Sequence, residues 1–326
     1  AVMVALAFIG LSRIPTGFLP IEDQGYLIAA VQLPAGASLE RTDRTLKDVE
    51  QRLRTQPGVA NVITVAGVSL LDNNAPLSNA GMAYIVLEPW DERGKEESLL
   101  PIYNAISSKL ANLDDGFAIA VPPPSIQGIG NTGGFTMMVE LTDGSGDFER
   151  LSNIAHKVAN RALDDPRLQA TQVNANFSAP QLGVTIDRTK AATFGVAIGD
   201  IFNTLSGYLG SSYVNQFTRF GHTFQVYVQA EGSYRSVVEG IARLKVPNAS
   251  GSLVPVSSML TVEEKVGPSL ISLYNLHPAT SIVGRPQPNI SSGEAMGILE
   301  NAAAEVLPIG AATDWTGISY QEKLAG

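Results

Sequence analysis

A pattern of strand, helix and strand recurs four times along this sequence and limits the folds open to it. Apolar runs predict the strands, and apolar residues spaced three or four apart predict one buried face on each helix. Ser38 precedes the first helix as an N-cap, and Ser291 with Glu294 has the spacing of a capping box before the last. The copies cover residues 26–65, 83–121, 135–173 and 280–314.

Two such copies side by side form a ferredoxin-like sandwich of one sheet and two helices. The first two copies are adjacent and predict one subdomain over residues 14–130. The last two are separated by residues 181–266, an insert with its own strands and helix that is long enough to be a domain. We therefore predict an α+β protein of two ferredoxin-like βαβ sandwich subdomains, the second (131–180 and 267–326) interrupted by a mixed α/β subdomain.

Residues 1–13 form an apolar run that carries no charge before Arg13. About 12 residues at 1.5 Å each cover about 18 Å, less than a hydrocarbon core of about 30 Å. We therefore expect a short remnant of a transmembrane helix. A buried core helix and the apolar part of a signal peptide are the alternatives, although a basic segment does not precede the run.

Charge and motif content argue against several classes of protein. With 31 acidic and 22 basic residues the net charge is −9, and no basic cluster alternates with aromatic residues, so we expect no nucleic-acid partner. There is no cysteine, and the histidines at 156, 222 and 277 are far apart, so we expect no metal site. Residues 128–133 contain GxGxxG, but prolines precede it and a strand follows, which is the wrong order for a dinucleotide cofactor. We find no catalytic constellation and expect no enzyme.

The connection between the first two copies is long. Residues 67–81 join two predicted strands, where a hairpin needs about two to five residues. Half of the segment is apolar, and Gly67 and Gly81 flank it, so we predict a switch loop that rearranges while its flanking strands stay fixed. An ordinary surface loop is the alternative.

Short motifs in order along the whole chain resemble one family. They resemble the second periplasmic half, with porter and docking subdomains, of resistance-nodulation-division (RND) efflux transporters of the hydrophobe/amphiphile multidrug class. The motifs include Phe18-Leu19-Pro20 with Glu22-Asp23-Gln24-Gly25, Gln32-Leu33-Pro34, Pro122-Pro123-Pro124 with Gly133-Gly134-Phe135, Asp187-Arg188, Tyr213-Val214-Asn215, Gly293-Glu294-Ala295-Met296, and Trp315-Thr316-Gly317 with Ser319-Tyr320-Gln321-Glu322.

The resemblance implies a homotrimer in the bacterial inner membrane that exports hydrophobic or amphiphilic small molecules by proton antiport, with this portion in the periplasm. Its implied partners are the remainder of the same transporter chain, a periplasmic adaptor (membrane fusion) protein and an outer-membrane channel. Residues 1–12 would end the seventh transmembrane helix, and the proton-relay residues would lie outside this chain.

The resemblance also implies two substrate pockets. The deep pocket would be lined by Ile28, Ala30, Ile63, Val65, Val68, Leu70, Met82 and Tyr84, and the entrance pocket by Ile119, Val121, Pro123, Ile126 and Val283. Studied drug pumps of the family carry phenylalanines at several of these positions, where this chain is aliphatic or has tyrosine. The wall still buries apolar ligand surface, at about 25 cal/mol per Å².

Three other functions compete with multidrug export. A metal exporter would place soft methionine ligands at the cleft, and residues 26–33 and 117–134 contain none. An RND exporter of lipids or other hydrophobic compounds is closer, although the Pro- and Gly-rich crossing favours the drug-pump class. The third is a stand-alone ferredoxin-like ligand-binding module, against which the apolar N-terminal run argues.

Overall fold

The computed structural model of the chain describes residues 22–124, 135–175, 177–287 and 290–325. The predicted transmembrane remnant (1–13), the GxGxxG segment and Ile126 lie outside these ranges. Within them, every helix is too short or too polar to cross a membrane. The chain divides into two compact units, Pro180–Lys265 and the residues on either side of it. Helices and antiparallel sheets are mixed throughout, which confirms the predicted α+β class.

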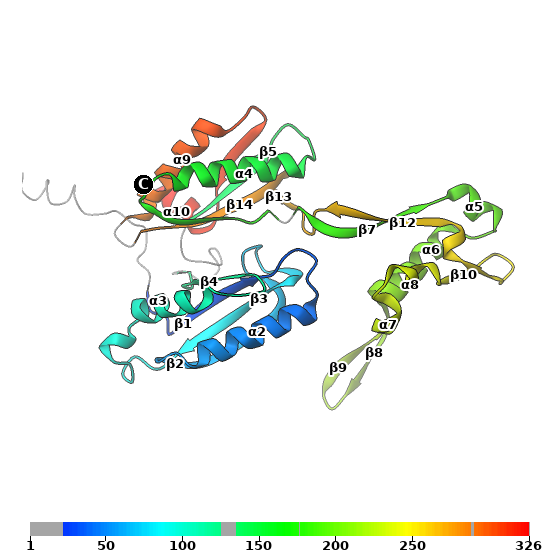
Figure 1. Cartoon of the computed structure of the whole chain (residues 1–326), viewed down its shortest axis with the longest axis horizontal. Coiled ribbons are helices and arrows are strands. Elements are labelled where there is room, and N and C mark those ends of the chain that lie inside the picture. The colour runs from blue at the N-terminus through cyan, green and yellow to red at the C-terminus, as the bar shows by residue number, and fades with distance from the viewer. Residues whose placement is uncertain (1–21, 125–134, 176, 288–289, 326) are drawn as a thin grey trace, which may run out of the picture. The chain divides into compact units, whose positions relative to one another are not determined.

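One antiparallel sheet with two helices forms the first sandwich (Figure 1). Its elements are β1 (Tyr26–Gln32), α2 (Leu39–Arg54), β2 (Val59–Ser69), β3 (Ala75–Leu87), the 3-10 turn η1 (Lys95–Glu97), α3 (Leu99–Leu110) and β4 (Phe117–Val121). The strand order β2-β3-β1-β4, with α2 after β1 and α3 after β3, is the interleaved βαβ pair that the sequence predicts.

Both helices pack on the same face of this sheet. Ser38 caps α2 as predicted, because its Oγ accepts from the backbone N–H of Arg41 at 3.2 Å. Leu46 and Leu53 lie two turns apart on α2 and pack into one core with Ile85 of β3. We call this side of the sheet the helix face.

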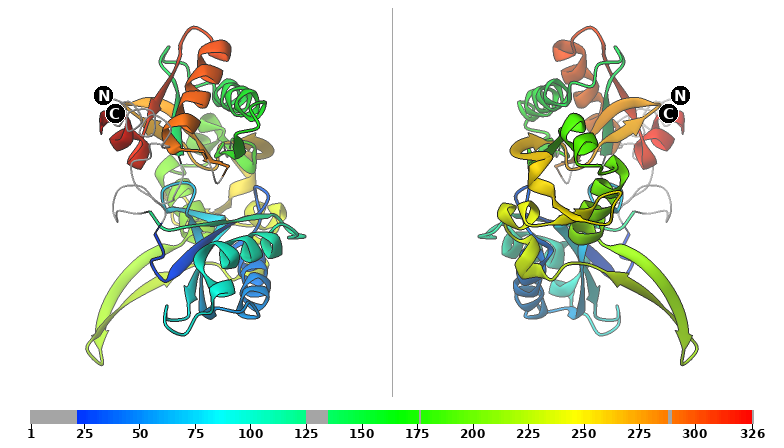
Figure 2. Two further views of the ribbon diagram at one scale, coloured as in Figure 1. Left: turned by 90° about the vertical axis from the view of Figure 1, so that its left-hand side faces the viewer. Right: turned by 90° about the vertical axis from the view of Figure 1, so that its right-hand side faces the viewer.

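The second sandwich repeats the arrangement. Its elements are β5 (Phe135–Leu141), α4 (Phe148–Leu163), β6 (Leu168–Val173), β13 (Ser272–Tyr274), β14 (His277–Pro286), α9 (Ser292–Val306), β15 (Ala311–Trp315) and α10 (Gly317–Ala325). The sheet runs β13-β14-β5-β15, and β6 also pairs with β14. Helices α4 and α9 lie side by side and share one core with the sheet (Figures 1 and 2). The sequence did not predict α10.

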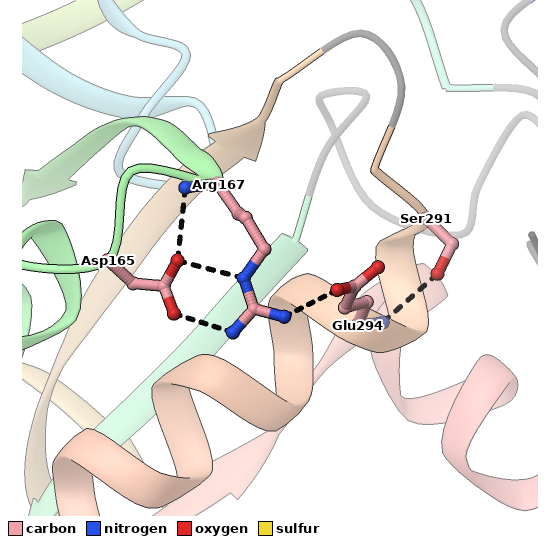
Figure 3. Close-up of polar contacts among 4 residues, drawn as sticks. All are labelled: Asp165, Arg167, Ser291 and Glu294. Carbon is pink, nitrogen blue, oxygen red and sulfur yellow. Dashed lines mark hydrogen bonds and ion pairs between the residues drawn. The ribbon is translucent and has the colours of Figure 1, made fainter.

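A cluster of charged side chains fixes the start of α9 (Figure 3). Arg167 makes two bonds to the Asp165 carboxylate, at 2.9 and 2.6 Å, and a third to Glu294 at 2.5 Å. The Oγ of Ser291 accepts from the backbone N–H of Glu294 at 3.2 Å, which confirms half of the predicted capping box. The Glu294 carboxylate on α9 accepts a hydrogen bond from Arg167, which directly precedes β6. This contact therefore connects the start of β6 to the start of α9.

The second unit, Pro180–Lys265, has a core of its own. Its elements are β7 (Ala179–Ile186), α5 (Arg188–Thr193), α6 (Ile198–Leu205), the π-helical turn η2 (Ser206–Gly210), β8 (Ser212–Arg219), β9 (His222–Val228), α7 (Gly232–Arg235), α8 (Val238–Ala242), β10 (Lys245–Pro247), β11 (Leu253–Pro255), the 3-10 turn η3 (Val256–Ser258) and β12 (Leu260–Gly267). β7 and β12 pair where the chain enters and leaves the unit. Ala191, Ile201, Val246 and Val256 are fully buried at its centre.

β8 and β9 form a two-stranded hairpin within this unit (Figure 2). Its aromatic side chains are exposed to an unusual degree, including Tyr213 (50%), Phe217 (51%) and Phe220 (81%). Tyr213 packs on Tyr227 and Phe217 on Phe224 across the strands, with ring centroids 5.4 Å apart in each pair. The hairpin therefore presents a preformed apolar ribbon that the rest of its own unit does not cover.

Candidate ligand-binding site

The face of the first sheet that points away from α2 and α3 is apolar. Successive strand residues alternate between the faces, so every second residue lies on this side, which we call the open face. The strand register sets them in two rows: Ile63, Tyr84, Ile28 and Val121, and next to it Val65, Met82, Ala30 and Ile119. All eight are positions that the resemblance implied for the two pockets, and the register brings them together on one surface.

Burial changes across the open face. Ile28, Met82 and Val121 are only 3–5% exposed, whereas Ile63 at the β2 side is 51% exposed. The hairpin end of β2 and β3 accounts for the covered part, because Leu70 is buried against Ile28 and its neighbours and Val68 packs beside it. The site is therefore an apolar surface that is covered at one end and open at the other.

The segment predicted as a switch loop, residues 67–81, is a strand hairpin with a tight turn, so the prediction of a long loop is wrong. β2 continues to Ser69, and β3 begins at Ala75. Asn73 and Asn74 both adopt positive φ (54° and 61°), and the N–H of Ala75 donates to the carbonyl of Asp72 at 3.0 Å. Asparagine tolerates this left-handed conformation, so the two residues make a tight turn within the five residues that join β2 to β3.

Gly67 and Gly81 have different structural roles. Gly67 has φ of 85° and lies where the β2–β3 register shifts, which marks a bulge. Gly81 is paired with Val31 inside β3, and a Cβ there would approach Leu46 Cδ1 to 2.6 Å. Gly81 therefore permits close packing of α2 on the sheet, and it does not flank a loop as the sequence predicted.

The implied entrance positions fall on two sheets. Ile119 and Val121 lie on the open face, and Pro123 follows them and is buried. Val283 lies on β14 of the second sandwich, paired with Thr136. Ile126 lies outside the described residues.

Among the described residues, two hydrogen bonds connect the sheets of the two sandwiches. The side-chain amide of Asn174 donates to the carbonyl of Leu71 at 2.7 Å and to Ser281 Oγ at 3.0 Å, so the tip of the β2–β3 hairpin is bonded to the second sheet. Arg285 Nη2 donates to the carbonyl of Ala120 at 3.2 Å. The first contact reaches the β2–β3 hairpin and the second reaches β4, and both of these elements carry residues that the resemblance implied for the pockets.

The hairpin turn also carries a half-buried acid, Asp72. Burial raises the pKa of Asp72, although Ser69 Oγ donates to its carboxylate at 2.7 Å and opposes the shift. A carboxylate held in this position keeps the turn polar beside the apolar open face.

Three residues of this region were not anticipated from the sequence: Tyr26, Asn174 and Arg285. Tyr26 precedes Ile28 and Ala30 by steps of two and packs on the open-face cluster, with its ring 6.4 Å from that of Tyr84. Strand alternation could have found it, and the same step of two leads from Val283 to Arg285. Asn174 follows the end of β6, and nothing in the local pattern marks it.

The open face can offer a ligand apolar contacts. Its side chains are aliphatic apart from Tyr26, Tyr84 and the thioether of Met82, so they can bury apolar ligand surface. Within the described ranges, no group of three or more histidine or acidic side chains is placed to hold a metal ion.

The two-sandwich fold, the sequence motifs and the apolar open face are all consistent with one protein family. The chain belongs to the AcrB/AcrD/AcrF family, whose model matches residues 1–326, and this confirms the resemblance to RND multidrug efflux transporters. Similar proteins include the multidrug/solvent efflux pump membrane transporter MepB of Pseudomonas putida, 39% identical over 97% of this chain, and the multidrug export protein AcrF of Escherichia coli, 37% identical over 100%. The multidrug resistance protein MdtF of Escherichia coli is 34% identical over 96%. The chain spans 30–31% of the length of these relatives.

Proposed function

We propose that this chain is the periplasmic substrate-binding and docking portion of a proton-driven RND efflux pump that exports hydrophobic and amphiphilic small molecules. The family supports the class of protein, and the relatives' names describe drug or solvent export. The open face is the single observation that carries the proposal for this chain. It is a preformed apolar surface, covered at one end and open at the other, with no catalytic group among its residues.

The proposal gives each part of the chain a role. Residues 14–130 and residues 131–180 with 267–326 are the two porter subdomains, and residues 181–266 are the docking subdomain. We propose that the whole transporter is a homotrimer in the inner membrane with a periplasmic adaptor and an outer-membrane channel. The exposed aromatic ribbon of β8 and β9 supports a role of the docking subdomain in contacts between subunits, because such ribbons are rarely left exposed in a monomer.

We further propose that the β2–β3 hairpin gates the open face. Leu70 covers Ile28 in the present arrangement, and Gly67 supplies a bulge at which the hairpin end can bend. Movement of the hairpin would uncover the buried end of the face, so that ligand passes from the entrance positions to the deep ones. The carboxylate of Asp72 is half-buried, and because desolvation disfavours its charged form, it opposes deeper burial of the turn.

A matched pair of substitutions in the full-length transporter tests the proposed site. Ile63→Asp places a charge on the open face at a residue that is 51% exposed, so we expect the variant to fold. Leu100→Asp is the control, at a 62% exposed residue in the first turn of α3, where an acid is tolerated. We expect Ile63→Asp to lower the efflux rate of the neutral dye N-phenyl-1-naphthylamine from energised cells at least fivefold and Leu100→Asp to leave it unchanged. Equal rates in both variants and the parent, at equal protein amounts, would refute the site.

A further inference from the structure

We propose that Arg285, with the free edge of β4, binds the negatively charged head group of an amphiphilic ligand, such as a carboxylate, sulfate or sulfonate. The inference rests on the proposed function and names a substrate class for the same site. It starts from the position of Arg285 on β14, two residues after Val283 and therefore on the same face of the second sheet.

The guanidinium group of Arg285 is held against the first sandwich by two contacts. Its Nη2 donates to the carbonyl of Ala120 at 3.2 Å. The guanidinium carbon Cζ lies 4.8 Å from the centre of the Tyr103 ring on α3. Ala120 lies between Ile119 and Val121, whose side chains line the open face. The charge is thus fixed at the edge of the strand that carries two implied entrance residues.

This charge has no acidic partner. All 31 acidic residues of the sequence fall within the described ranges, and none of them forms an ion pair with Arg285 there. A guanidinium has five N–H donors, and a single backbone carbonyl accepts from this one among the described residues. Burial lowers the pKa of Arg285, but an arginine keeps its charge at any physiological pH. A half-buried cation with donors that no other described residue uses is therefore available to an anion.

The backbone beside it offers a second donor. β4 is an edge strand, and the carbonyl of Ala120 points away from β1 because it accepts from Arg285. In an antiparallel strand the N–H and the C=O of one residue point to the same side, so the Ala120 N–H also faces the free edge. A carboxylate or sulfonate could accept from this N–H and from the guanidinium together, while its apolar body lies on the neighbouring aliphatic side chains.

Two dyes that share one aromatic skeleton separate the contribution of the ligand's negative charge to binding from that of its apolar contact. 8-Anilinonaphthalene-1-sulfonate and N-phenyl-1-naphthylamine differ by the sulfonate group alone. We would titrate both, by fluorescence, against the purified full-length transporter in nanodiscs of neutral lipid, with empty nanodiscs as the blank. The variants are Arg285→Gln, Arg285→Lys and the control Arg44→Gln, which removes an exposed arginine of α2.

We expect Arg285→Gln to weaken binding of the sulfonate dye at least fivefold and to change the Kd of the neutral dye less than twofold. Arg285→Lys keeps the charge without the planar fork and should give an intermediate loss. Arg44→Gln should change neither Kd. Equal weakening of both dyes by Arg285→Gln, or no change for the sulfonate dye, would overturn the anion site and leave Arg285 as a structural contact.

The same materials distinguish this inference from the proposed function. Efflux of the neutral dye from energised cells that express the parent transporter tests export alone, because this dye has no anionic group. Absence of that efflux would refute the proposed function, while the ratio of the two Kd values would still decide whether Arg285 binds an anion.

Discussion

The two sandwiches share the order of their four repeat strands (β2-β3-β1-β4 and β6-β14-β5-β15) but differ in the face that their helices leave uncovered. In the first, the open face is apolar, with Ile28 and Met82 nearly buried. In the second, the corresponding face carries Glu140, Asp314 and Arg285 on neighbouring strands. Helix packing fixes the composition of one face in each sheet, and the other face is free to acquire a different chemistry.

The polar face of the second sheet contains a perturbed acid. Glu140 is 4% exposed on the central strand β5. Burial, and then the negative charge of Asp314 on the adjacent strand, raise the pKa of Glu140, while His277 partly opposes the shift. The second sheet thus holds charge where the first holds methyl and thioether groups, and this contrast can be tested by exchange of side chains.

The largest effect is expected when a charge is placed on the apolar face. Met82 and Met138 occupy the two corresponding faces, on β3 and β5. Met82→Lys puts an ammonium group among buried aliphatic side chains and should destabilise the protein by about 3 kcal/mol or more. Met138→Lys places it opposite Asp314, and we expect a change within about 1 kcal/mol. The measurement is the unfolding midpoint of the purified full-length protein. Similar losses in both variants would remove the distinction between the faces.

An intermediate effect is expected when the acid of the polar face is neutralised. Because the pKa of Glu140 is raised on folding, the charged form destabilises the folded state as the pH rises from the ordinary pKa of a glutamate through the raised value. Glu140→Gln should therefore raise the unfolding temperature at pH 8, and the gain should vanish near pH 4. Glu264→Gln, at an exposed glutamate of β12, is the control and should show no such trend. A gain that is the same at both pH values would contradict this assignment.

The smallest effect concerns how the helices begin. The start of α9 is held by Ser291 and by the Arg167 cluster, whereas Ser98 before α3 makes no side-chain capping bond. The bonds from Arg167 lower the pKa of Asp165 to about 2. Their stabilising contribution is therefore complete above the ordinary pKa near 4 and is lost as the pH falls towards 2.

Arg167→Gln should lower the unfolding temperature slightly at pH 6, and the difference from the parent should shrink between pH 4 and pH 2. Arg188→Gln, at an exposed arginine that forms no ion pair among the described residues, is the control. A constant difference across this range would show that Asp165 is not the partner that matters.

Much of the architecture follows from local pattern. The apolar spacing of Leu46 and Leu53 and the cap at Ser38 are enough to predict α2, and the same reasoning predicts α4, α6 and α9. Each of these signals lies within one or two helical turns, so the sequence carries it without any knowledge of the partner surface. Four copies of one pattern then suffice to predict two sandwiches and an insert.

The site was decided by contacts between segments far apart in the sequence. Alternation places Ile63, Tyr84 and Ile28 on some face of their strands, but only the register of three strands makes them one row. Local pattern gave the wrong result at residues 67–81, because two asparagines in the left-handed conformation and a bulge at Gly67 let the strands continue. From the sequence alone, Arg285 is only an arginine within a predicted strand. It is a candidate anion site because tertiary contacts hold its guanidinium against the edge of β4 and the ring of Tyr103. Sequence fixes what each segment can bury, and tertiary structure decides which charge is left without a partner.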